Sequence, residues 1–144
     1  MNPGTIRILF ALFLLAHGWI HMSLAQVPLP QPGGIRTPYL PSWWRDAVNP
    51  TWPAVKMGLP PQIARTLGWA LWALIFGSYA AAGAALLFIP AQAGIWQSLT
   101  ILGSAASLLL LGLYWHPWLP IGILIDLALL AAIFMRSPLI QFGR

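Results

Sequence analysis

The stretch from Ile6 to Ala25, IRILFALFLLAHGWIHMSLA, decides the fold. It is apolar except at four positions, Arg7, His17, His21 and Ser23. About 20 apolar residues in a helix cross the roughly 30 Å hydrocarbon core, where backbone groups find no water to pair with. We therefore predict a transmembrane helix over about 6–25.

The same stretch also has the order of a secretory signal peptide. Arg7 would be the charged start, Ile8 to Ala16 the apolar core and Ser23 to Ala25 the cleavage site. Two histidines and Trp19 are unusual in a segment that is removed, so we interpret it as a retained first helix.

The composition extends this reading to the whole chain of 144 residues. Only 6% of the residues are charged and 59% are hydrophobic, whereas soluble domains carry roughly a quarter charged residues. We predict a single integral membrane domain, 1–144, with the lipid bilayer as its partner.

The net charge of +5 is dispersed along the chain, which suits lipid headgroups and argues against nucleic acid. The chain has no cysteine, which excludes disulfides and thiolate sites.

Three further apolar segments, about 62–89, 95–115 and 120–135, complete a predicted all-α, four-helix transmembrane bundle. Small residues in 77–85 of the second helix, and Gly103, Ser104 and Ser107 of the third, predict close helix packing. Thr100, Ser104 and Ser107 could line a pore. We expect them instead to bond back to carbonyls of their own helix.

The segment of about 26–61 is rich in proline and cannot hold a long helix. Tryptophan and basic residues alternate there, a composition typical of the headgroup level. We predict an interfacial loop with one short helix starting at Ser42; the alternative is a mobile connection. The interfacial residues are Trp43, Trp44, Arg45 and Trp52.

Successive transmembrane helices cross the bilayer in opposite directions, so their order predicts which polar groups lie near the same membrane surface. His21 and His116 are expected at the membrane surface that carries the long loop, with His17 one turn deeper than His21. Asp126 enters from that surface on the last helix, so His17 and Asp126 both lie roughly 10 Å down. A lone carboxylate at mid-helix costs about 2.5–3.5 kcal/mol and takes a partner. We predict a His17–Asp126 pair, with His21 as the second candidate.

Several interpretations of these residues stay open. The pair is structural, or His17, His21, His116 and Asp126 bind a metal ion, although Gly18 stands where zinc hydrolases carry a glutamate. A haem would need His21 and His116 as its ligands, because His17 and His21 share one helix face. A proton path is a further reading, as is a quinone-like pocket beneath Trp43 and Trp44. The cofactor is left undetermined.

The chain resembles a group of small bacterial four-helix membrane proteins. The matching residues are Ala16-His17-Gly18 with Ile20-His21, Tyr114-Trp115-His116-Pro117-Trp118, and Ile125-Asp126-Leu127. The resemblance implies architecture, a multi-pass protein of the bacterial inner membrane, and no catalytic residue. A basic start before an apolar helix favours cytoplasmic termini.

From the residues we expect a structural or accessory subunit of a membrane assembly, either a homo-oligomer or a larger complex, with no evident catalytic activity. Nine tryptophans and the small-residue faces motivate this expectation. The alternative is the intramembrane His/Asp site, holding a metal, haem or quinone-like cofactor or relaying protons.

Overall fold

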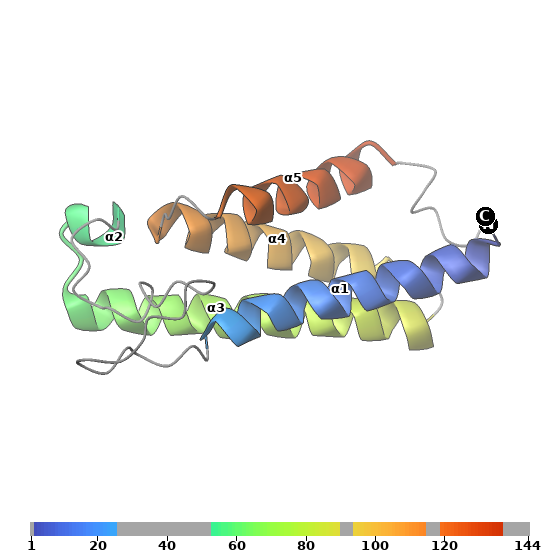
Figure 1. Ribbon diagram of the computed structural model, residues 1–144, viewed down its shortest axis with the longest axis horizontal. Helices are drawn as coiled ribbons and strands as arrows, with labels where there is room; N and C mark the ends of the chain where they lie inside the picture. Colours follow the sequence, from blue (N-terminus) through green and yellow to red (C-terminus); the bar gives the residue numbers. More distant parts are fainter. Residues whose placement is uncertain (1, 26–52, 90–93, 115–118, 137–144) are drawn as a thin grey trace, which may run out of the picture.

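A computed structural model describes residues 2–25, 53–89, 94–114 and 119–136. Within these ranges the chain is all-α, with four long helices and one short one, which confirms the predicted fold class. The helices are α1 (Pro3–Ala25), α2 (Pro53–Lys56), α3 (Pro61–Phe88), α4 (Ile95–Leu113) and α5 (Pro120–Phe134). Figure 1 shows the long helices side by side, with α2 at one end of α3.

Prolines and glycines set where these helices begin. Four of the five helices in the described ranges start at a proline, where the missing N–H would have no helical partner anyway. The fifth, α4, follows Gly94, whose φ of 70° is left-handed and favours glycine. α5 ends where Arg136 takes a φ of 51°. The predicted starts at about 62, 95 and 120 lie within one residue of those of α3, α4 and α5, whereas α1 begins at Pro3 instead of Ile6 and the start of α2 was not predicted.

The described part of the predicted loop contains the short helix α2. Pro53 begins a single helical turn, which closes with a bond from Met57 N to Pro53 O of 2.9 Å. Gly58, with φ at 84°, then ends it. The helix predicted from Ser42 and the four interfacial residues lie outside the described residues.

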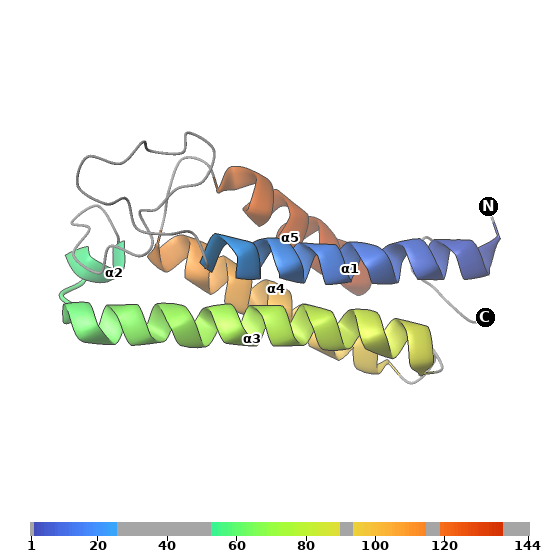
Figure 2. The same ribbon diagram turned by 60° about the horizontal axis from the view of Figure 1, so that its bottom comes forward.

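The long helices pack in series, α1 on α3, α3 on α4 and α4 on α5. In Figure 2, α1 and α3 run antiparallel along most of their length, while α5 crosses behind α1. Glycines permit the closest approach: a Cβ on Gly83 of α3 would lie 2.9 Å from the backbone oxygen of Ala11. The small-residue faces predicted on the second and third helices thus form helix contacts.

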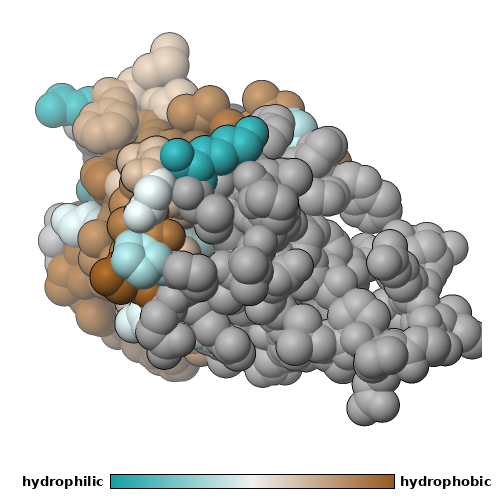
Figure 3. All heavy atoms as spheres, turned by 90° about the vertical axis from the view of Figure 1, so that its left-hand side faces the viewer, coloured by the Kyte–Doolittle hydropathy of each residue, from teal (hydrophilic) through white to brown (hydrophobic). Residues whose placement is uncertain are grey.

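The chain is a membrane protein by the length and apolarity of its helices. Three of the described helices can cross a bilayer, through Pro3–His21, Thr66–Phe88 and Ile95–Leu113, while α5 is apolar but shorter. Large apolar side chains are exposed on α1 and α5, among them Trp19, which is 62% exposed. The end-on view of Figure 3 shows that most of the visible described surface is apolar, with a few hydrophilic residues at this end.

Candidate functional site

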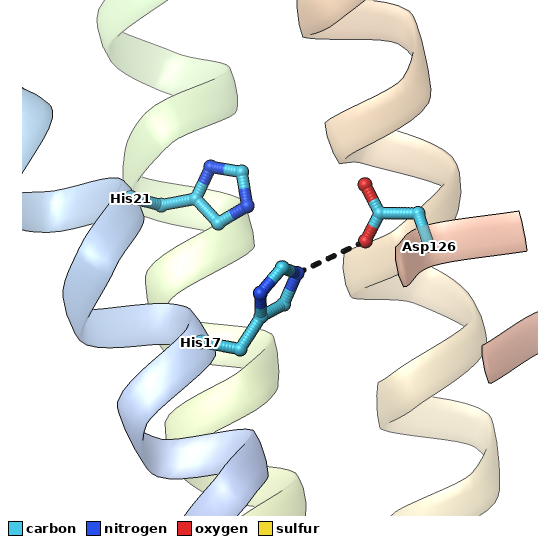
Figure 4. Close-up of side chains that lie close together, drawn as sticks. All are labelled: His17, His21 and Asp126. Carbon is cyan, nitrogen blue, oxygen red and sulfur yellow. Dashed lines mark hydrogen bonds and ion pairs between the residues drawn. The ribbon is translucent and has the colours of Figure 1, made fainter. Parts of the chain in front are cut away.

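The centre of the site is Asp126 on α5, which is fully buried. Its Oδ1 lies 3.2 Å from His17 Nε2 on α1, so the pair predicted from matching depths is present. Figure 4 shows the His17 and His21 rings on the side of α1 that faces Asp126. His17 is also buried, and its ring contacts the His21 ring edge-on, with centroids 4.9 Å apart.

His21, which the sequence places at the membrane surface that carries the long loop, is enclosed by other helices of the bundle. Only 5% of it is exposed. Trp72 of α3 packs edge-on against its ring, and its Nε2 lies 3.4 Å from Ser107 Oγ on α4. Side chains from α3 and α4 cover His21.

Tyr79 of α3 joins the site and was missed by the sequence analysis. Its hydroxyl donates to Asp126 Oδ1 at 2.5 Å and lies 2.9 Å from Ser104 Oγ on α4. Its ring meets the His17 ring edge-on at 4.7 Å. The available signal was a single phenol within a run of alanine, serine and glycine on a predicted packing face.

The serines of α4 also differ from expectation. Thr100 bonds back to Trp96 O at 2.7 Å, as predicted for residues of this type. Ser104 and Ser107 instead bond across the bundle, to Tyr79 and His21. They do so because both lie on the buried face of α4, where cross-helix polar partners are within reach.

Two buried polar atoms in this cluster have no hydrogen-bond partner, His21 Nδ1 and Asp126 Oδ2. Unpartnered groups of this kind are rare because each costs the full desolvation penalty. One ligand atom from each of His17, His21 and Asp126 lies within 4.8 Å of the other two. Two imidazole nitrogens and a carboxylate oxygen are a donor set that zinc and neighbouring transition metals accept.

Of the four predicted ligands, three converge, and His116 lies outside the described residues. Asp126 is the only carboxylate in the described ranges, since Asp46, the other acid in the chain, falls outside them. The converging residues come from α1 and α5, at opposite ends of the packing series, with Tyr79 of α3 between them. The site therefore exists only when the bundle is assembled.

The chain matches no protein-family model, no curated protein and no solved structure in the three comparisons. The resemblance to small bacterial four-helix membrane proteins therefore stays a prediction.

Proposed function

We propose that this membrane protein binds one divalent transition-metal ion inside its helix bundle, at His17, His21 and Asp126. The observation that carries the proposal is the convergence of three buried ligand groups, two of which each keep a polar atom without a partner. A purely structural pair of His17 and Asp126 gives no reason to bring a second imidazole, His21, to the same place.

The donor set indicates the class of ion. Imidazole nitrogen favours zinc, iron, nickel or copper over calcium and magnesium, which prefer oxygen ligands. Bonds of 2.0–2.2 Å to a tetrahedral ion place ligand atoms about 3.4 Å apart. The present spread of up to 4.8 Å is thus closed by small side-chain rotations. Each ligand atom must be free of a proton to bind the ion.

Haem is not favoured by this geometry. His17 and His21 are one turn apart on one face of α1, with ring centroids 4.9 Å apart, so they cannot lie on opposite sides of one macrocycle. The remaining histidine, His116, lies outside the described residues.

The test is elemental analysis and metal titration of the purified full-length protein in mild detergent. We expect one Zn²⁺ or Co²⁺ per chain for the wild type and loss of binding in Asp126→Asn, which keeps the size of the side chain and removes its charge. Thr100→Val is the matched control, because it alters a buried hydroxyl bonded only within α4. A wild type that binds no more metal than Asp126→Asn overturns the proposal.

A structural or accessory subunit is the second candidate. It is supported by the hydrogen bonds that tie α1, α3 and α5 together through Asp126, and by the exposed apolar faces of α1 and α5. It predicts a metal-free particle that associates with itself or a larger complex beyond one bundle. A strictly monomeric particle in several mild detergents contradicts it.

We further propose that the protein lies in the bacterial inner membrane with both termini in the cytoplasm. Arg7 near the start of α1 and the antiparallel order of α1, α3, α4 and α5 support this orientation.

A further inference from the structure

Tyr79 is the largest fully buried side chain among the described residues, and it is not itself a proposed ligand. It is fully buried, and its hydroxyl lies between Asp126 and Ser104. A phenol has a single proton, and Tyr79 donates it to Asp126. The Ser104 hydroxyl must then donate to Tyr79. The two hydrogen bonds form a chain in which Ser104 donates to Tyr79 and Tyr79 donates to Asp126.

Two glycines lie close to Tyr79. A Cβ on Gly18 of α1 would lie 3.0 Å from Tyr79 Cβ, and a Cβ on Gly103 of α4 would lie 3.2 Å from Tyr79 Cε2. Gly18 therefore lets α1 approach the start of the side chain, and Gly103 lets α4 approach the edge of the ring. Packing against both helices holds the hydroxyl in position before any ligand arrives.

This placement has a consequence for the carboxylate of Asp126. Oδ1 accepts hydrogen bonds from both Tyr79 and His17, while Oδ2 is left without a partner. Turning the carboxylate away from this arrangement would break the bond to Tyr79. One carboxylate oxygen is thus held by its two donors, and the other, Oδ2, is left to take a ligand.

We propose that Tyr79 is the positioning residue of the metal site, holding Asp126 as a ligand through a single oxygen, Oδ2. This inference rests on the proposed function. Outer partners that hydrogen-bond a metal ligand orient it and tune its affinity, and their loss typically costs 10–100-fold in metal binding.

The experiment titrates Co²⁺ into full-length wild type, Tyr79→Phe and Tyr114→Phe, following visible absorption. Tyr114→Phe is the matched control, since its hydroxyl bonds to Ala64 O, away from the site. We expect Tyr79→Phe to bind about 10–100-fold more weakly. Its Co²⁺ bands should also weaken, because a released carboxylate binds through both oxygens and raises the coordination number. Tyr114→Phe should match the wild type in affinity and spectrum.

The outcomes separate the two proposals. Absence of Co²⁺ binding by the wild type beyond that of Asp126→Asn overturns the metal site itself. Wild-type binding together with an unchanged affinity and spectrum in Tyr79→Phe overturns the role of Tyr79 alone, as does an equal loss in Tyr114→Phe. If Tyr79→Phe does not fold, Ser104→Ala, which keeps the ring and removes the donor to its hydroxyl, decides the question. An unchanged Co²⁺ spectrum in Ser104→Ala then overturns the inference, and a changed one supports it.

Discussion

At the scale of single residues, Asp126 links three helices, because it lies on α5 and bonds to His17 of α1 and Tyr79 of α3. It is fully buried, and two donors from different helices meet on one of its oxygens. A buried carboxyl group of this kind is tolerated only when it is paired and hydrogen-bonded. The amide of asparagine keeps the acceptor oxygen, whereas alanine removes it.

We therefore expect Asp126→Ala to lower the free energy of unfolding by about 1–3 kcal/mol relative to Asp126→Asn, because Tyr79 loses its buried acceptor. Unfolding of the metal-free proteins by SDS in mixed micelles measures the difference. Equal midpoints for the two variants would contradict the importance of this acceptor.

The residues of the site differed in how well they could be predicted. His17 and Asp126 were found because charged or polar groups within apolar helices must find partners at their own depth. Tyr79 was not found, because the sequence does not show which group a tyrosine hydroxyl bonds to. Without that partner, a tyrosine in an aromatic-rich chain cannot be distinguished from an ordinary core residue. The partners lie 25 and 47 positions away in sequence, on α4 and α5, and only the three-dimensional packing shows which face of α3 meets them.

At the scale of helices, contact between α1 and α3 depends on Gly83. A Cβ there would lie 2.7 Å from Leu15 Cγ and 2.9 Å from the backbone oxygen of Ala11, which cannot move without shifting α1. We expect Gly83→Ala to destabilise the protein by about 1–3 kcal/mol.

Gly77, also on α3, has no atom within 4 Å of such a Cβ and serves as the control. Gly77→Ala should be neutral, or stabilising by up to about 1 kcal/mol through helix propensity. The same SDS titration measures both variants, and equal effects would mean that α1 does not approach α3 at Gly83.

Arg7 ties α1 to the C-terminal end of α3, about one turn beyond Gly83. Its Nε donates to Leu86 O at 2.5 Å and its Nη2 to Ile89 O at 2.8 Å, which satisfies carbonyls at the end of α3 that have no helical partner. Charge-assisted bonds of this kind contribute about 1.5–3 kcal/mol, so Arg7→Met should destabilise the protein by roughly that amount. Arg7→Lys should recover part of it. Thermal unfolding in detergent tests the order wild type, Lys, Met, and a Met variant as stable as the wild type would refute it.

Helix ends were predictable to the extent that they depend on local chemistry. Pro61 and Pro120 indicate in the sequence where α3 and α5 begin, since the backbone preference of proline acts within one turn. The bonds of Ser104 and Ser107 were not predictable in this way, because a serine in a helix has an adequate partner in its own backbone. Which partner it takes depends on what the neighbouring helix presents.

At the scale of the whole molecule, the antiparallel helices make a topology test direct. The chain has no cysteine, so single cysteines can be added at Met57, after α2, and Met135, after α5, which are 71% and 80% exposed. With cytoplasmic termini, a membrane-impermeant maleimide added to intact cells should label Met57→Cys but not Met135→Cys until the cells are permeabilised. Labelling of Met135→Cys alone would reverse the orientation.

The same experiment examines α5. Its 15 residues span about 22 Å, less than the roughly 30 Å hydrocarbon core. If both cysteines are labelled from outside, α5 returns to the surface from which it starts, and the four-crossing arrangement is wrong.

The edge of the Tyr79 ring packs against Gly103, and this has an evolutionary consequence. A methyl group gained at position 103 would lie 3.2 Å from Tyr79 Cε2, so the ring must shift or position 79 must lose volume, and with it the hydroxyl that holds Asp126. Gly18 is under a different constraint, because a methyl group there would meet Tyr79 Cβ, which any residue except glycine carries. Among descendants of this chain, we expect Gly103 and Tyr79 to be inherited or abandoned together, and Gly18 to be kept whichever side chain stands at position 79.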